Sequence, residues 1–174
     1  MPIIKHIGTQ IHITRFGKGK PNIITPFGNS LHKPHGGMWT STFNKKGMYK
    51  SEWHEFIMHN VPEWFGSAWL VYPKNTLKIF DLASTNDIQW LIDDGYAVYD
   101  PQAYENQFEH REYYSDPYTL FNRRYIINWD ELGKKFDALH IPRYMTPRYM
   151  DGWDVESTVW FKDKFEKIER YFYK

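Results

Sequence analysis

The carboxylate of Glu156 is the side chain in this sequence that is best placed to do chemistry. It lies in the segment "WDVES", between Trp153 and Trp160, and Asp154 precedes it by two residues. A fixed carboxylate stabilises the positive charge that develops on a sugar when its glycosidic bond breaks. We therefore expect Glu156 to be a catalytic residue. The alternative is that it alternates with Val155 on a strand and faces solvent.

Two glycines and three hydroxyl side chains lie close together in the stretch "KPHGGMWTST", residues 33–42. Glycine has no Cβ, so Gly36 and Gly37 would let the backbone approach a ligand. Thr40, Ser41 and Thr42 would place hydroxyl groups beside it. This mixture favours a nucleotide site, most simply for NAD. As alternatives, the glycines form a turn and the hydroxyl residues belong to an edge strand.

Arg15 ends the alternating segment "TQIHITR". Its forked guanidinium suits a diphosphate better than a lysine would; a surface ion pair is the alternative. Trp39 and Tyr49 are candidates for stacking on a nicotinamide ring, or else belong to the core. His12 either contacts the ribose of adenosine or lies on a strand face.

Together these segments resemble the ADP-ribosyltransferase superfamily in its arginine–serine–glutamate form. The resemblance implies that Arg15 holds the phosphates of NAD and that the strand 40–42 shapes the nicotinamide pocket. It also implies that Asp154 and Glu156 form the acid-x-Glu pair, with Glu156 catalytic. The paired strands of that family resemble the segments "WLVYP" and "TLKIFDLAS".

The chain departs from the family pattern in three ways. Its middle strand reads Thr-Ser-Thr rather than Ser-Thr-Ser, and Asp154 stands where the family has Glu or Gln. The long interval between Ser41 and Glu156 is nearer to that of the DNA- and RNA-modifying toxins, which carry an inserted helical region.

The function implied is transfer of ADP-ribose from NAD, as substrate, to a macromolecule, with nucleic acid favoured over protein as the acceptor. Glu156, Ser41 and Arg15 are the expected catalytic residues, with Ser41 orienting Arg15 or Glu156. The expected NAD-binding residues are His12, Arg15, Gly36, Gly37, Trp39, Thr40, Thr42, Tyr49 and Asp154. Such a protein would act as a toxin, or elsewhere in bacterial or phage conflict, and a neutralising protein is a possible partner.

Charge distribution points to a second class of function, which is the alternative. Residues 1–51 hold eight basic side chains and no acidic one, whereas the remainder carries a net charge of −7. Combined with an aromatic content of 19%, the basic segment could bind single-stranded nucleic acid by phosphate contacts and stacking. A non-catalytic nucleic-acid-binding module, or a small inhibitor that presents aromatic residues to a protein, is therefore the alternative.

We expect no metal site. The spacings of His32, His35, His54 and His59 match no closed zinc pattern, and the chain has no cysteine to assist them. The segment His12-x-Thr14 is half of the repeated motif of two-histidine phosphoesterases, and the second copy is missing.

The absence of cysteine and of long apolar runs predicts a cytoplasmic protein without membrane contact. We expect one domain over residues 1–174, of α+β class, with two small and mostly antiparallel sheets forming an NAD cleft flanked by helices. Strands are predicted in "TQIHITRF", "MWTSTF", "SAWLVYP", "TLKIFDLAS" and "WDVESTVWF", and helices in "SEWHEFIMHN", "STNDIQWLIDDG", "NWDELGKKFDALH" and "KDKFEKIERYFYK". Residues 96–125 are expected to form loops with short helical pieces.

Overall fold

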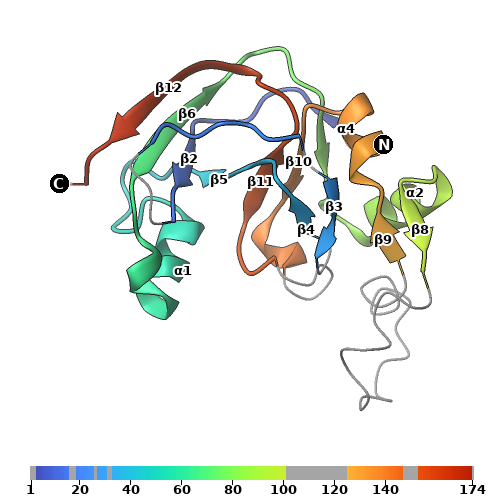
Figure 1. Cartoon of the computed structure of the whole chain (residues 1–174), viewed down its shortest axis with the longest axis horizontal. Helices are drawn as coiled ribbons and strands as arrows, with labels where there is room; N and C mark the ends of the chain where they lie inside the picture. The colour runs from blue at the N-terminus through green and yellow to red at the C-terminus, as the bar shows by residue number, and fades with distance from the viewer. Residues whose placement is uncertain are drawn as a thin grey trace.

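The computed structural model describes residues 3–15, 19–25, 27–30, 33–100, 125–146 and 153–173. It has an α+β fold in which a large curled sheet is flanked by helices (Figure 1). The strands are β1 (Ile3–Ile4), β2 (Gln10–Ile13), β3 (Phe27–Ser30), β4 (Lys33–His35), β5 (Met38–Thr42), β6 (Ala68–Pro73), β7 (Ile79–Asp81), β8 (Ala97–Tyr99), β9 (Tyr125–Ile127), β10 (Ala138–Ile141), β11 (Ser157–Trp160) and β12 (Phe165–Tyr171). The helices are α1 (Glu52–Asn60), α2 (Thr85–Asp93) and α4 (Trp129–Lys135), with short 3-10 turns at Pro62–Trp64 and Arg143–Met145.

The main sheet has eight strands in the order β1-β7-β10-β11-β5-β2-β6-β12. All neighbouring strands are antiparallel except β7 and β10, which are parallel. Strand β5 links the strands β1-β7-β10-β11 to the strands β2-β6-β12, because it pairs with β11 on one side and with β2 on the other. The predicted pair of small sheets forming a cleft is therefore replaced by one large sheet, whose mostly antiparallel pairing is as predicted. The two-stranded sheets β3–β4 and β8–β9 are additional to the large one.

Local sequence signals placed the starts of the three helices in the described part of the chain correctly. Ser51 caps α1 and accepts a hydrogen bond from the backbone N–H of His54, as expected for a hydroxyl at this position. Asn128 caps α4 and accepts from the N–H of Glu131. Helix α2 is followed by Gly95 at a φ of 77°, a left-handed conformation that glycine adopts at low cost.

The predicted closing helix was wrong, because residues 165–171 form strand β12, which pairs with β6. Phe165 and Ile168 are three residues apart, a spacing typical of a helix. In the structure a β-bulge between Phe165 and Lys167 inserts one extra residue. The bulge shifts the alternation of side chains, so both apolar residues pack against the same cluster.

Two further expectations need correction. Helix α4 ends at Lys135, and the residues predicted to extend it form β10, which gains backbone hydrogen bonds from β7 and β11 on both edges. Strands β6 and β7 exist as predicted, but they do not pair with each other; β6 lies between β2 and β12.

Much of the aromatic content is used in the core. Trp129, Trp153 and Trp160 are fully buried, together with Phe80 and Phe136. No helix within the described ranges has the length and apolar character needed to cross a membrane. Residues 96–125 were expected to form loops with short helical pieces, but Ala97–Tyr99 form strand β8, which pairs with β9 starting at Tyr125. Residues 101–124 lie outside the described residues.

Candidate active site

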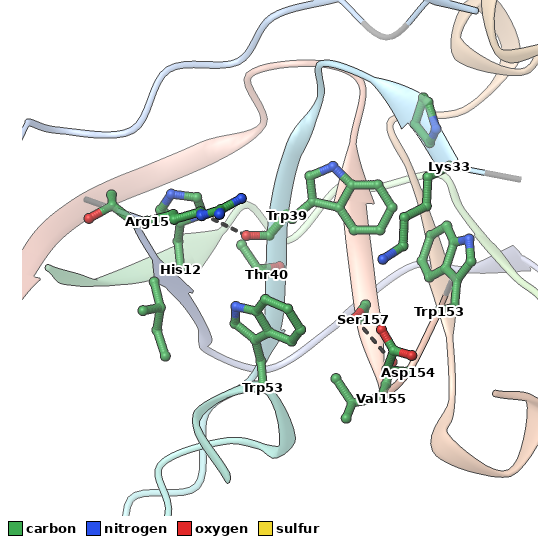
Figure 2. Close-up of a pocket in the computed structure, with 13 residues that line it drawn as sticks. His12, Arg15, Lys33, Trp39, Thr40, Trp53, Trp153, Asp154, Val155 and Ser157 are labelled. Carbon is green, nitrogen blue, oxygen red and sulfur yellow. Dashed lines mark hydrogen bonds between the residues drawn. The ribbon is translucent and has the colours of Figure 1, made fainter. Parts of the chain in front are cut away.

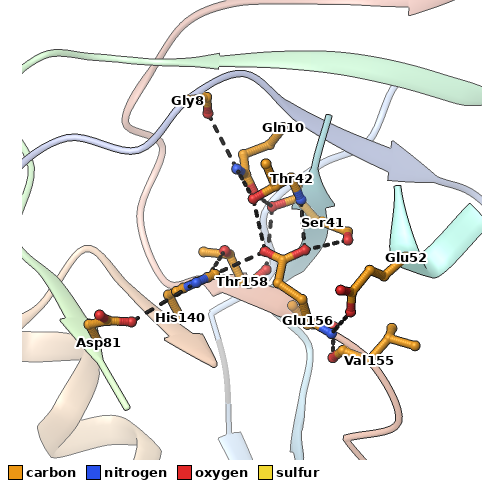
Figure 3. A network of polar contacts seen from close by, with 12 residues as sticks. Gly8, Gln10, Ser41, Thr42, Glu52, Asp81, His140, Val155, Glu156 and Thr158 are labelled. Atoms are coloured by element: carbon orange, nitrogen blue, oxygen red, sulfur yellow. Dashed lines mark hydrogen bonds and ion pairs between the residues drawn. The ribbon is translucent and has the colours of Figure 1, made fainter. Parts of the chain in front are cut away.

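Glu156 is held in a cradle of hydrogen-bond donors from β5 (Figure 3). Its Oε2 accepts from Ser41 Oγ at 2.5 Å and from the backbone N–H of Thr42 at 2.8 Å. Its Oε1 accepts from Thr42 Oγ1 at 3.0 Å. Ser41 is fully buried, and Glu156 is only 9% exposed. The carboxylate is thus fixed in orientation by two adjacent residues that lie 114 and 115 positions earlier in the chain.

Sheet register explains why these residues meet. Strands β5 and β11 are antiparallel, with Thr40 opposite Thr158, so the residue that precedes β11 comes beside the end of β5. Helix α1 fixes the same point from the other side, since Glu52 Oε2 accepts the backbone N–H of Glu156 at 2.9 Å. The position of the carboxylate is therefore determined by two strands and a helix terminus.

Burial and hydrogen bonding act on the Glu156 carboxylate in opposite directions. Desolvation raises the pKa of Glu156, while the donors of Ser41 and Thr42 lower it and so offset part of that rise. The ionised carboxylate thus has hydrogen-bond donors that partly replace the water it lacks in this poorly solvated site. A buried carboxylate arranged in this way interacts strongly with a nearby positive charge, because little water screens the interaction.

The partly buried imidazole of His140, which was not among the predicted site residues, adjoins the same carboxylate. His140 Nδ1 lies 3.5 Å from Glu156 Oε1 and 3.0 Å from Thr158 Oγ1. On its other side, His140 Nε2 lies 4.0 Å from Asp81 Oδ1. Burial lowers the pKa of His140 and raises the pKa of Asp81. His140 and Asp81 are opposite each other on the parallel strands β10 and β7, a pairing that no short sequence motif reveals.

A second layer of hydrogen bonds supports the cradle from the core. The buried Gln10 donates from Nε2 to Thr42 Oγ1 at 3.2 Å and accepts at Oε1 from Thr40 Oγ1 at 3.1 Å. Trp160 Nε1 in turn donates to Thr40 Oγ1 at 2.9 Å. The Thr40 hydroxyl therefore serves the internal network, although Thr40 also lines a cavity.

A cavity of about 470 Å³, called here the Arg15 cavity, contains several of the predicted nucleotide contacts (Figure 2). Its volume is typical of small-molecule sites. Predicted site residues that line it are His12, Arg15, Trp39, Thr40 and Asp154, and they are joined there by Trp53, Trp153 and Lys33. Among the described residues, the walls thus contain three tryptophans, two cations and one acid.

The polar groups of the Arg15 cavity have defined environments. His12 Nδ1 donates to the carbonyl of Trp39 at 2.6 Å, and burial lowers the pKa of His12, which favours the neutral ring. The guanidinium of Arg15 lies over Trp64, 4.0 Å from the ring centroid. Lys33 Nζ lies 5.6 Å from the ring centroid of Trp39. Burial lowers the pKa of Lys33, and the charge of Asp154 partly opposes that change.

A second cavity, of about 410 Å³, is called here the Glu156 cavity. Thr42, Tyr49, Glu52, Glu55 and Glu156 line it. Tyr49 is fixed by contact of its hydroxyl with His59 Nε2 at 3.2 Å. The two cavities adjoin, since Val155 and Trp53 line the first while their neighbours Glu156 and Glu52 line the second.

The structure thus brings some predicted site residues together and separates others. Ser41, Thr42 and Glu156 are in direct contact, and Arg15 lies in the neighbouring cavity. Gly36 and Gly37 line neither cavity. They form the turn between β4 and β5 at φ values of 81° and 70°, and the carbonyl of Gly36 accepts the indole N–H of Trp39. Gly36 and Gly37 therefore form a turn, which was the alternative to a direct contact with the ligand.

The described residues contain no group of three or more His, Asp or Glu side chains that could hold a metal ion. Of the four histidines considered for such a site, His32 lies outside the described residues. His54 packs against Tyr49, Phe65 and Tyr173.

Comparison of this chain with models of protein families, with curated proteins and with solved structures finds no match.

Proposed function

We propose that this protein is an NAD-dependent ADP-ribosyltransferase that modifies a macromolecule, with nucleic acid favoured as the acceptor. The observation that carries the proposal is the buried Glu156 carboxylate held by Ser41 and Thr42 beside a cavity. Breaking the bond between nicotinamide and ribose develops positive charge on the sugar, which a carboxylate fixed in advance stabilises without reorganisation.

The reaction divides into two bond changes. The ribose C1′–N bond breaks, its electron pair leaves with nicotinamide, and a nucleophile of the acceptor forms a new bond to C1′ and gives its proton to solvent. Glu156 stabilises the oxocarbenium-like sugar between these changes. Ser41 and Thr42 orient the carboxylate, and their donors offset part of the rise in its pKa that burial causes.

Binding of the dinucleotide is assigned to both cavities. The cations of Arg15 and Lys33 in the Arg15 cavity suit a diphosphate. Trp39 on that side, or Tyr49 in the Glu156 cavity, supplies a ring on which nicotinamide packs. His12, held neutral through burial, offers Nε2 to a ribose hydroxyl. NAD would extend from the Arg15 cavity across the 155–156 segment, so that its nicotinamide ribose meets Glu156.

The decisive experiment incubates the protein with NAD labelled in the adenosine part and then separates RNA, DNA and protein fractions. We expect label in one fraction, and loss of that label in the Glu156→Gln variant, which keeps the shape of the side chain and removes its charge. NAD binding should persist in Glu156→Gln.

Glu63→Gln is the matched control, because Glu63 is exposed and lines neither cavity; it should retain activity. Absence of label in every fraction together with no consumption of NAD would contradict the proposal and favour the non-catalytic binder.

A further inference from the structure

A third cavity, remote from Glu156, is surrounded by lysines. It measures about 570 Å³ and is called here the lysine cavity. Its six lysines are Lys5, Lys78, Lys134, Lys135, Lys162 and Lys164, and Asp137 is the one acidic residue among the described residues that line it. A concave surface with such a charge raises the local concentration of anions.

The six lysines come from four segments that are far apart in sequence. Lys5 follows β1, Lys78 precedes β7, Lys134 and Lys135 end α4, and Lys162 and Lys164 lie between β11 and β12. Five of the six belong to the part of the chain with net negative charge. The fold, rather than the order of residues, therefore concentrates positive charge here.

Asp137 organises this concentration of charge. It is 7% exposed, and its Oδ2 accepts the backbone N–H of Lys78 at 2.9 Å. Its Oδ1 lies 3.7 Å from Lys162 Nζ and 3.8 Å from Lys164 Nζ. One carboxylate thus draws two ammonium groups to the same rim and can neutralise only one of them.

Three other acids reduce the charge from outside the cavity, and one of them, Asp130, acts on Lys134 through its charge. Glu131 pairs with the largely exposed Lys134, and Asp94 lies 3.7 Å from Lys135. Exposed pairs of this kind are weak, so an external anion can compete with them. With these four acids counted, the six lysines keep an excess of two positive charges over Asp94, Asp130, Glu131 and Asp137.

We propose that the lysine cavity binds the phosphate backbone of a nucleic acid. Lysine is a point charge that suits phosphates without reading sequence. A protein partner is disfavoured, since lysine is depleted at protein interfaces whereas aromatic residues and arginine are enriched there, and the described lining holds neither of these. The surface is a binding site in its own right.

The place of this surface in the fold gives it a further use, which rests on the function proposed above. Glu156 precedes β11, and Lys162 follows the same strand by two residues. Six residues of extended chain span about 20 Å at roughly 3.3 Å per residue. Figure 1 shows the β6–β7 connection at the top of the view and α4 at the upper right, whereas α1 lies lower, at the left. A nucleic acid held by the lysines could therefore reach the Glu156 end of the sheet.

The test compares two triple variants that remove the same charge. Lys5, Lys78 and Lys134 are changed to Gln in the first, because all three are exposed. Lys20, Lys45 and Lys46, exposed lysines of the basic first third, are changed to Gln in the control. Unfolding in urea verifies that each variant is folded.

Binding of fluorescein-labelled single-stranded RNA and DNA is measured by anisotropy over a range of salt concentrations. Each lost contact to a single strand reduces the salt slope by about 0.7, which at about 0.1 M salt is roughly fivefold in affinity. The first variant should therefore bind about 100-fold more weakly, with a slope shallower by about 2. The control and Glu156→Gln should bind like the unchanged protein.

Several results would overturn the inference. Equal losses in both triple variants would show an effect of net charge only. Poly-glutamate binding as tightly as RNA would identify a surface for acidic proteins, and displacement of RNA by low concentrations of inorganic phosphate would identify a small-anion site. Because Glu156→Gln abolishes only the proposed transfer, RNA binding that persists in that variant separates this inference from the proposed activity.

Discussion

Removing the Ser41 hydroxyl tests directly whether the cradle holds an ionised carboxylate. Ser41→Ala deletes the donor that lies 2.5 Å from Glu156 Oε2 in a fully buried position. A hydrogen bond to a charged group contributes about 1.5–3 kcal/mol, and one between neutral groups about 0.5–1.5 kcal/mol. We expect the variant to be destabilised by about 2 kcal/mol where Glu156 is ionised and by about 1 kcal/mol where it is protonated.

The sign of the pH dependence follows from the pKa of Glu156. Burial raises this pKa above its unfolded value, and Ser41 opposes the rise. The stability that Glu156 contributes is therefore complete below the unfolded pKa and is lost as the pH rises through the folded pKa. Without Ser41 the folded pKa rises further, so the deficit of the variant grows as the pH rises.

Urea unfolding of four proteins measures this effect: the unchanged protein, Ser41→Ala, Glu156→Gln and the double variant. The difference caused by Ser41→Ala should increase with pH while Glu156 is present and should not depend on pH once Glu156→Gln has removed the charge. A pH-independent difference in both backgrounds would show that Ser41 does not stabilise a charged carboxylate and would refute the reasoning.

Three further predictions address other parts of the molecule. Arg15→Ala should weaken NAD binding by about 10- to 150-fold, the equivalent of one hydrogen bond to a charged group, and Arg15→Lys should restore only part of it; calorimetry that shows full affinity in either variant contradicts the assignment. Gly36→Ala should lower the unfolding free energy by about 1–3 kcal/mol, because its φ is 81° and a Cβ would lie 3.0–3.1 Å from two carbonyl oxygens, whereas Gly133→Ala within α4 should raise it by up to about 1 kcal/mol. Asp81→Asn should lower the pKa of His140, since the charge of Asp81 raises it; an NMR titration in which that pKa stays or rises would be contrary to the structure.

Signals that act over a few residues were readable from the sequence. The hydroxyl of Ser51 and the amide of Asn128 marked the starts of two helices because capping is a local interaction. The alternation in "TQIHIT" likewise marked β2. The contact of Ser41 with Glu156 agrees with the predicted convergence of those two residues, although that prediction came from a resemblance rather than from spacing.

Features that depend on strand pairing could not be read in this way. His140 lies beside Asp81 because β10 pairs with β7 in a parallel arrangement. No local sequence pattern specifies that these two strands are neighbours. Because of the bulge in β12, Phe165 and Ile168 pack on the same side of a strand although their spacing of three residues is typical of a helix. The basic residues in 1–51 suggested a charged surface formed by that segment. The lysine cavity instead takes five of its six lysines from residues 78–164.

The two adjoining cavities permit a final test that separates a transferase from a binder. Arg15 and Trp53 line one cavity, while Tyr49 and Glu156 line the other. A ligand that reacts at Glu156 while its diphosphate contacts Arg15 must occupy both, whereas AMP is short enough to stay in the Arg15 cavity. With NAD we therefore expect shifts in the NMR signals of both Trp53 and Tyr49, and with AMP a shift of Trp53 alone. Glu156→Gln should leave the Trp53 response unchanged, because its side chain lies outside the Arg15 cavity. A Tyr49 signal that is unaffected by saturating NAD would mean that the dinucleotide never reaches the carboxylate, and Glu156 would then be a structural acid.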